Sequence, residues 1–293
     1  MSDPYLDPET GVLRNRLGLK SADTLDLAER RAASLGLDRI DAGYGPERTF
    51  DREHLKAIHR QIFGRVYEWA GAMRDEKPLV GGEKLDPVGV LSKGGSAFLH
   101  ASHIDMGLAK AFRHISDRAA LRDGSRETFI RKAGNTLGDL NYIHPFREGN
   151  GRTQRAFIEE LGRETGHDVD FRGITRERMI SASIEVTNDP SSDAMRHVVR
   201  DAVDPVRLDA LIKVRGMLLN AGFDPDERYV VSARDGEYIE GQIAWHGSDH
   251  AHVVTRQRLV VVNAADVSQH DDGSKDVILM ASPFSVVSSN DGS

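Results

Sequence analysis

The chain of 293 residues is long for one compact domain and a comfortable length for two. Its 39 Lys and Arg against 46 Asp and Glu give a net charge of −7 without a long basic run, which argues against a nucleic-acid-binding protein. No stretch approaches the roughly 20 apolar residues that span a bilayer, and the N-terminus lacks the pattern of a signal peptide. Because there is no cysteine, we expect no disulfide and no thiolate metal site, as is common in a cytoplasmic protein.

Residues 1–222 carry mainly helical patterns. Within residues 51–73 apolar side chains recur every three or four positions, as they do on the buried face of a helix. Similar stripes occupy residues 129–140, 157–161, 175–187 and 193–203. Asp204 followed by Pro205 predicts the N-cap and first turn of one more helix, which would end near Gly222.

After Gly222 the pattern changes to short strands. Runs rich in β-branched and aromatic residues alternate with turn-forming segments, and these runs are residues 229–231, 238–245, 252–255, 259–262 and 277–280. Five strands in so short a segment predict a small β-barrel or sandwich. We therefore expect a mainly α protein with a helical domain over 1–203, a connecting helix over 204–222 and a small β domain over 223–293.

One segment between two predicted helices carries groups that suit phosphate binding. Gly149, Asn150 and Gly151 are residue types that accept positive φ, so their N–H groups can turn toward one anion. The helix that follows adds the N–H groups of its first turn. Arg152 and Arg155 are three positions apart on that helix, where both can reach a phosphate.

The same segment supplies a base and a metal ligand. Histidine is the residue type whose unperturbed pKa permits proton abstraction near neutral pH, which makes His144 the candidate base. Glu148 offers the oxygen ligand that Mg²⁺ prefers. Phe146 is apolar within a polar loop, which predicts that it anchors the loop to the core. A histidine, a glycine-rich turn or an arginine pair is usually structural when it occurs alone. Their convergence within twelve residues indicates a functional site.

The segment resembles the signature of Fic proteins, His-x-Phe-x-(Asp/Glu)-Gly-Asn-Gly-Arg-x-x-Arg, with every fixed position filled. Residues 66–71 look like the helix end that precedes the Fic flap, and residues 92–98 resemble the flap itself. Residues 126–165 follow the two central helices of the family. The resemblance extends over about residues 15–203.

This resemblance implies a protein adenylyltransferase that moves AMP from ATP to a Tyr, Thr or Ser hydroxyl of a target protein and releases pyrophosphate. It implies that His144 deprotonates the hydroxyl and that Glu148 holds Mg²⁺. The residues that it assigns to ATP and its phosphates are Gly149, Asn150, Gly151, Arg152, Arg155, Lys93 and Gly94. The flap that would dock the target comprises Ser92, Lys93, Gly94, Gly95, Ser96, Ala97 and Phe98.

Residues 75–87 depart from the common Fic pattern, because they separate the helix end from the flap. The segment is charged and turn-rich. It is either a tolerated surface loop or an arm that selects the target protein. Its prolines and glycines predict no role in the core.

Many Fic proteins carry an inhibitory helix with the pattern (Ser/Thr)-x-x-x-Glu-(Gly/Asn). The nearest matches are residues 49–53, followed by His54, and residues 181–185, followed by Val186, and neither completes the pattern. We therefore expect inhibition by a separate small protein, or an effector that a secretion system delivers into another cell.

The C-terminal β unit resembles the OB-like domain that follows Fic in some type IV secretion effectors and conjugation-linked toxins. His246, His250 and His252 cluster in it. A metal site is conceivable there, but without nearby carboxylates we favour ordinary surface histidines.

Two alternatives remain open from the sequence. The same fold could transfer another nucleotide or phosphate-linked group, because an anion site does not identify the base. It could also be a non-catalytic effector module that binds nucleotide and partners. The presence of both His144 and Glu148 favours an enzyme.

Overall fold

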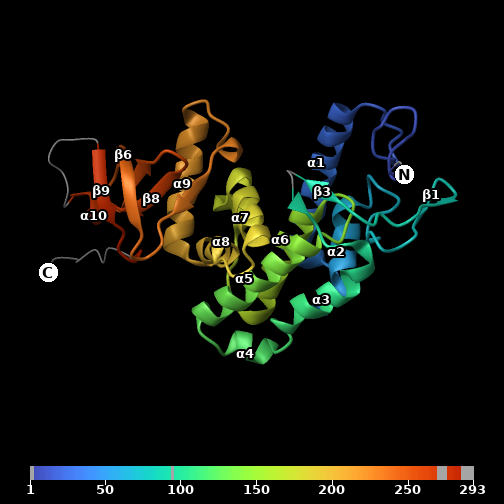
Figure 1. The fold of residues 1–293 in the computed structure, drawn as a ribbon, viewed down its shortest axis with the longest axis horizontal. Coiled ribbons are helices and arrows are strands. Elements are labelled where there is room, and N and C mark those ends of the chain that lie inside the picture. Colours follow the sequence, from blue (N-terminus) through green and yellow to red (C-terminus); the bar gives the residue numbers. More distant parts are fainter. Residues whose placement is uncertain (1–2, 94–95, 269–275, 285–293) are drawn as a thin grey trace. The chain divides into compact units, whose positions relative to one another are not determined.

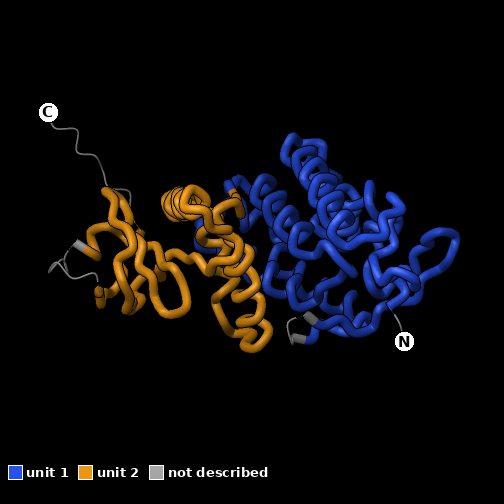
Figure 2. The backbone as a smooth tube through the Cα atoms, turned by 90° about the horizontal axis from the view of Figure 1, so that it is seen from above, with its two compact units in different colours: residues 1–168 blue, residues 169–293 orange. Residues whose placement is uncertain are grey.

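The structure is a computed structural model that describes residues 3–93, 96–268 and 276–284. It divides into two compact units, Met1–Asp168 and Val169–Ser293 (Figure 2). The expected boundary after residue 203 is therefore not the place where the units divide. The helices on both sides of that position belong to the second unit.

The first unit is a bundle of helices (Figure 1). Its α-helices are α1 Ala22–Arg39, α2 Arg52–Phe63, α3 Ile104–Arg113, α4 Arg118–Arg122, α5 Arg126–Ile143 and α6 Asn150–Thr165. Helix α6 packs against both α2 and α5, while α1 packs against α2 and α3 against α5. The apolar stripes expected from the sequence form this core, in which Ile58, Leu137 and Phe157 are fully buried.

Side-chain caps fix where the central helices begin. Asp51 accepts a hydrogen bond from the N–H of His54 at the start of α2, and Ser125 accepts one from Thr128 at the start of α5. Helix α5 ends at His144, whose backbone is left-handed. These boundaries place the signature segment at the junction of α5 and α6.

Two short hairpins lie between α2 and α3 in the sequence. Strands β1 Leu79–Val80 and β2 Glu83–Lys84 form one, and strands β3 Ser92–Lys93 and β4 Ser96–Ala97 form the expected flap. The expectation that residues 75–87 have no role in the core is wrong. The side chains of Val80 and Leu85 are buried, because they point inward on either side of the hairpin turn. Glu76 ties the base of the segment to α2 through Arg52 and Lys56.

The second unit begins with three helices and ends in a sheet (Figure 1). Helices α7 Arg176–Asn188, α8 Ala194–Val203 and α9 Pro205–Asn220 precede strands β5 Val230–Ser232, β6 Tyr238–His246, β7 His250–Val254, β8 Leu259–Asn263 and β9 Asp276–Met280. Asp204 caps α9 through the N–H groups of Val206 and Arg207, as the sequence predicts. Helix α9 packs against α8 and β5, so it is part of this unit rather than a simple connector.

The sheet has the order β5-β8-β7-β6-β9. Strand β5 is parallel to β8 and the other pairs are antiparallel. The short helix α10 Ala264–Ser268 packs against β7, β8 and β9. A mainly helical protein with a small C-terminal β domain is therefore confirmed, and five strands with one closing helix suit an OB-like barrel.

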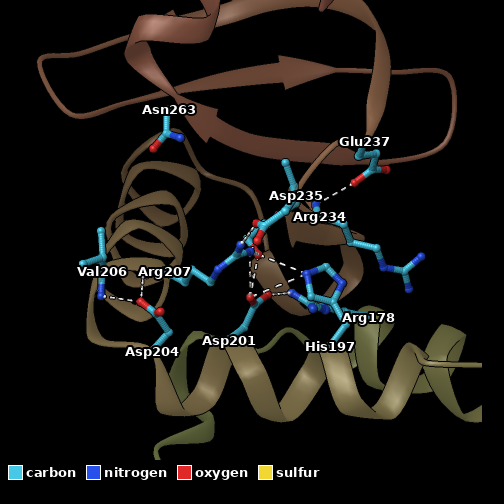
Figure 3. Close-up of polar contacts among 12 residues, drawn as sticks. Arg178, His197, Asp201, Asp204, Val206, Arg207, Arg234, Asp235, Glu237 and Asn263 are labelled. Carbon is cyan, nitrogen blue, oxygen red and sulfur yellow. Dashed lines mark hydrogen bonds and ion pairs between the residues drawn. The ribbon is translucent and has the colours of Figure 1, made fainter. Parts of the chain in front are cut away.

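A buried polar cluster joins the helices of the second unit to its sheet (Figure 3). Asp201 on α8 is fully buried and pairs with Arg178 on α7. The hydroxyl of Ser232 on β5 donates to Asp201 at 2.5 Å, and Arg207 on α9 donates to the Ser232 oxygen at 2.7 Å. His197 also lies beside Ser232, at 3.2 Å. Because all five side chains are buried, this resemblance to a Ser-His-Asp arrangement is structural rather than catalytic.

The preference for surface histidines in the β domain is wrong for two of the three. His250 and His252 are 5% and 3% exposed, and the ring of Trp245 covers both at centroid distances of 5.1 and 4.6 Å. They alternate along β7 with Ala251 and Val253, which belong to the apolar core, so the two histidines share the opposite face of the strand. The described residues contain no group of three or more side chains suited to hold a metal ion. Nor does any helix in the described part of the chain have the length and apolar character to cross a bilayer.

Candidate active site

His144 stands at the point where α5 ends. Its φ of 47° and ψ of 60° are left-handed, and its N–H closes the helix on the carbonyl of Leu140 at 3.0 Å. Few non-glycine residues adopt this conformation, which turns the chain sharply out of the helix. The His144 ring lies flat against the ring of Phe98 on the flap, with centroids 3.8 Å apart and planes 9° apart. The base predicted from the sequence is therefore in direct contact with the predicted docking hairpin.

Phe146 follows His144 in the loop between α5 and α6. Its ring is fully buried and stacks on His59 of α2 at 3.9 Å. His59 accepts a hydrogen bond from the N–H of Gly71 at its Nδ1, so its Nε2–H donates to the carbonyl of Glu148 at 2.9 Å. Burial lowers the pKa of His59 to about 3, which keeps the ring neutral and this tautomer fixed. His59 thus joins the helix end after α2 to the signature loop.

Asn150 closes the same loop with its side chain. Its Oδ1 accepts from the N–H of Phe146 at 2.9 Å, and its Nδ2 donates to the carbonyl of Phe146 at 2.8 Å. The amide is therefore committed to the loop and is 3% exposed. Only the backbone N–H of Asn150 remains to bind an anion.

Gly149 is the residue that turns the loop into α6. Its φ is 82°, and a Cβ atom there would lie 2.3 Å from the Phe63 ring, so no other residue fits. Asn150 and Gly151 already belong to the helix, so the expected nest is a left-handed glycine followed by an ordinary helix start. No side chain caps this end of α6. The N–H groups of its first turn are thus available to an anion.

The two arginines of the signature have different surroundings. Arg152 pairs with Glu29 of α1, and its guanidinium lies 4.7 Å from the centre of the Phe63 ring. Glu29 also accepts a hydrogen bond from the hydroxyl of Tyr67, and burial followed by this bond raises the pKa of Tyr67. Arg155 lies one turn further on, with its Nη1 3.6 Å from the position of a Cβ built on Gly151. Both guanidinium groups are therefore near the start of α6.

Glu148 lies at the rim of a pocket of about 360 Å³. Glu29, Tyr67 and Arg152 line the same pocket, together with residues from the N-terminal segment and α1. One Oε atom of Glu148 accepts from the N–H of Gly149 at 3.0 Å. This holds the carboxylate beside the uncapped helix start, within reach of whatever binds there.

The structure describes only part of the predicted flap. Ser92 pairs with Ala97, and Lys93 pairs with Ser96, in the register of a hairpin. Gly94 and Gly95 lie outside the described residues. The following residue, Phe98, is joined to the chain before the hairpin by its N–H, which donates to the carbonyl of Leu91 at 3.0 Å.

Sequence reasoning missed His59 and Glu29. Each acts on the signature from far away in the chain, with sequence separations of 89 residues between His59 and Glu148 and 123 between Glu29 and Arg152. A histidine within an apolar helical stripe and a glutamate in an amphipathic helix carry no local signal of such contacts.

Comparisons with known proteins agree with this geometry. A model of the Fic/DOC family matches residues 49–161. The chain is 38% identical over 204 residues to the protein adenylyltransferase VbhT of Bartonella schoenbuchensis, which covers 68% of this chain and 38% of VbhT. It is 34% identical over 185 residues to the probable protein adenylyltransferase y4lH of Sinorhizobium fredii, which covers 63% of this chain and 88% of y4lH. The type IV secretion system effector protein BepA has a solved structure that matches with a TM-score of 0.83 and 26% identity, covering 96% of this chain and 97% of BepA. The chain therefore spans less than half the length of VbhT.

Proposed function

This chain belongs to the Fic/DOC family, and we propose that it transfers AMP from ATP to a hydroxyl side chain of a target protein. In this reaction the hydroxyl oxygen bonds to the α-phosphorus of ATP. The bond from that phosphorus to the bridging oxygen breaks, and pyrophosphate leaves. The names of the relatives, protein adenylyltransferases, support the same reaction.

The residues of the site divide the work between proton transfer and charge neutralisation. His144 takes the proton of the attacking hydroxyl, because its ring lies against the flap that would hold the target segment. The first-turn N–H groups of α6 bind phosphate oxygens, and Arg152 and Arg155 offset the negative charge that grows on the leaving pyrophosphate. Positioning and electrostatics supply most of what this kind of transfer requires.

Glu148 is suited to hold Mg²⁺ together with ATP. Mg²⁺ binds to proteins through one or two carboxylates plus substrate phosphates, and Glu148 is held beside the phosphate-binding helix start by the N–H of Gly149. When bound, the ion would neutralise part of the phosphate charge. Glu148 and the adjacent start of α6 therefore suit Mg²⁺ that binds together with ATP.

The observation that carries this proposal is the junction of α5 and α6. This loop contains His144 in a left-handed conformation, Gly149 at a position that accepts only glycine, and a helix start without a side-chain cap. A binding module would need the helix start but not a base stacked on the docking hairpin.

The test is incubation of the protein with Mg²⁺, a cell lysate and ATP labelled either in the α-phosphate or in the γ-phosphate. We expect proteins to acquire the α label but not the γ label. Transfer of the γ label would instead indicate a kinase-type reaction. Labelling by GTP, CTP or UTP in preference to ATP would indicate another nucleotide, and no labelling with normal ATP binding would indicate a binding module.

The partners are also proposals. We propose that the flap and residues 75–87 contact the target protein, since the segment directly precedes the flap in the chain. A separate small inhibitor is consistent with the missing inhibitory pattern. Delivery into another cell by a secretion system is supported by the likeness to BepA, which is a type IV secretion system effector.

A further inference from the structure

Arg74 is a fully buried arginine whose side chain contacts the backbone on both sides of the flap and at the end of α5. Its exposed fraction is 0%. The Nε atom donates to the carbonyl of His144 at 2.8 Å, and Nη2 donates to the carbonyl of Ile143 at 3.0 Å. Nη1 donates to the carbonyls of Val88 and Gly89 at 3.1 and 3.3 Å. Nη2 also donates to the carbonyl of Leu99 at 2.8 Å.

These bonds use all five N–H groups of the guanidinium. Within the described residues, every hydrogen bond that the side chain makes goes to a backbone carbonyl, and no carboxylate pairs with it. Burial lowers the pKa of Arg74 to about 10, so the group is still charged at neutral pH. A buried charge is costly unless its donors are all bonded. The planar guanidinium reaches all five carbonyls at once, and no other side chain has five donors in this geometry.

The five carbonyls belong to three pieces of chain that must meet at the active site. Val88 and Gly89 precede the first flap strand, Leu99 follows the second, and Ile143 and His144 end α5. The backbone of Arg74 extends the same connection. Its N–H donates to the carbonyl of Pro145 at 2.7 Å, and its carbonyl accepts from the N–H of Val88 at 3.0 Å.

We propose that Arg74 is a positioning residue that fixes the flap and the backbone of His144 in one geometry. Arg74 fixes the residues before and after the two flap strands relative to the backbone of His144. The ring contact between Phe98 and His144 depends on this placement. It does not touch the nucleotide. The phosphate-binding loop is held separately, by Asn150 on Phe146 and by His59 on Glu148.

This assignment rests on the proposed AMP transfer and makes a distinctive kinetic prediction. Loss of Arg74 should lower kcat and raise the KM for the target while leaving the KM for ATP nearly unchanged. Misplacement of reacting groups by about 1 Å can slow an enzyme roughly 100-fold, so we expect a fall in kcat of about 10- to 100-fold. A purely structural role would lower all activities together, in proportion to the fraction of protein that unfolds.

The experiment compares Arg74→Lys and Arg74→Gln with the unchanged protein. Lysine keeps the charge but cannot span five carbonyls, and glutamine keeps two donors without a buried charge. A matched control is Phe129→Leu, which removes buried volume from the same helix α5 about 20 Å before its end. Melting temperature, KM for ATP, KM for the target and kcat are measured for each variant.

Hydrogen exchange gives a readout that does not depend on activity. The N–H of Leu99 bonds to the carbonyl of Tyr142 at 3.0 Å, and the N–H of Ala101 bonds to the carbonyl of Gly89 at 2.8 Å. In the Arg74 variants these amides should exchange faster, while those of α2 and α6 stay protected. Phe129→Leu should leave Leu99 and Ala101 protected.

The outcomes separate the two proposals. Absence of AMP transfer in the unchanged protein would contradict the proposed function, while local loss of protection would still support Arg74 as the connection. A KM for ATP that rises together with the loss of kcat, or a kcat loss equal to that of Phe129→Leu, would overturn the assignment. Failure of both Arg74 variants to fold would show that the residue serves the fold as a whole, and would overturn it as well.

Discussion

At the scale of single residues, the role of His144 is the most direct to test. His144→Ala removes the base, and we expect AMP transfer to fall by roughly 10²- to 10⁴-fold. ATP binding should remain, because the helix start and the arginines do not depend on this side chain. The measurements are the rate of transfer from α-labelled ATP and the affinity for ATP.

The control for His144→Ala is His103→Ala, which removes an exposed histidine from the same unit. It should leave both quantities unchanged. Retention of more than about a tenth of the transfer activity in His144→Ala would mean that another group takes the proton.

The side chains of the signature could be predicted from the sequence because their chemistry is local. Twelve consecutive residues supply the base, the anchor Phe146 and the glycine turn. The partners that hold them could not be predicted. His59, Glu29 and Arg74 reach the loop across 70 or more residues of chain, and which buried donor meets which carbonyl depends on how the helices pack. Asn150 illustrates the same limit, because the sequence does not reveal that its side-chain amide forms two hydrogen bonds with the backbone of Phe146.

At the scale of elements, the hairpin of β1 and β2 is tied to the rest of the first unit on both sides of its turn, although several of its side chains are exposed. Val80 and Leu85 are buried, whereas Leu79 is 62% exposed. Arg14 pairs with Glu83 at 2.7 Å, and the N–H of Gly81 donates to Glu68 at 2.6 Å. The sequence identified the segment as turn-rich but could not reveal these inward contacts, because a two-residue strand has too few positions to show an alternating pattern.

Deletion of the whole hairpin would therefore damage the core, and a single exposed position tests target selection better. We expect Leu79→Ser to lower labelling of the preferred target about 5- to 30-fold, as the loss of 1–2 kcal/mol of contact would. The KM for ATP and the melting temperature should not change. Leu35→Ser, at an exposed position of α1, is the control, since Leu35 is 52% exposed. If Leu79→Ser labels the same proteins at the same rates as the unchanged protein, the hairpin does not select the target and is a tolerated surface loop.

The cluster around Asp201 is the second element-scale feature, since it joins α7, α8 and α9 to β5 (Figure 3). Burial alone would raise the pKa of Asp201, but Arg178, with His197 and Arg207, lowers it to about 2. The carboxylate is thus charged whenever the protein is folded at neutral pH. Its charge offsets those of two buried arginines.

Asp201→Asn keeps the size of the side chain and removes this charge. Arg207 keeps its ion pair with Asp235, but Arg178 then remains buried without a counter-charge. We therefore expect a loss of about 3–5 kcal/mol in the free energy of unfolding of the second unit. Urea titration followed by hydrogen exchange in β5 and α8 measures it. Asp209→Asn removes an exposed carboxylate that pairs with Lys213 on α9 and should have little effect. Equal shifts in the two variants would contradict the role assigned to Asp201.

At the scale of the whole molecule, the sequence pattern located α2, α5 to α9, the flap and the five C-terminal strands. It located neither α1, α3 and α4 nor the boundary between the units. Helix α8 packs against α7, α9 and the turn at Phe171–Gly173, all of which belong to the second unit. Periodicity reveals that a helix has a face to bury, not which neighbour buries it. The five strands were predictable because alternation and turns are local, while their order in the sheet came from pairing across the chain.

Buried histidines are spread through both units. Burial lowers the pKa of His54 and His252 to about 4 and that of His59 and His197 to about 3. His54 and His59 belong to the first unit, and His197 and His252 belong to the second. All four are neutral in the folded protein near neutral pH.

Both units should therefore lose stability as the pH falls from about 6.5 toward 4. In that window the unfolded chain, with histidine pKa values near 6.5, binds protons that the folded protein cannot, so the free energy of unfolding falls. Each such histidine contributes up to about 1.4 kcal/mol per pH unit, so the two in the first unit give up to roughly 3 kcal/mol per pH unit, and His250 adds to the two in the second. Urea midpoints at pH 7.5 and pH 5.0 measure the effect. His252→Phe keeps a ring beside Trp245 but cannot take a proton, so the second unit of this variant should lose less stability on acidification than the unchanged protein, with the effect of His197 and His250 remaining. His103→Asn, at an exposed position, should leave the pH dependence unchanged, and an unchanged dependence in His252→Phe would show that other groups take up the protons.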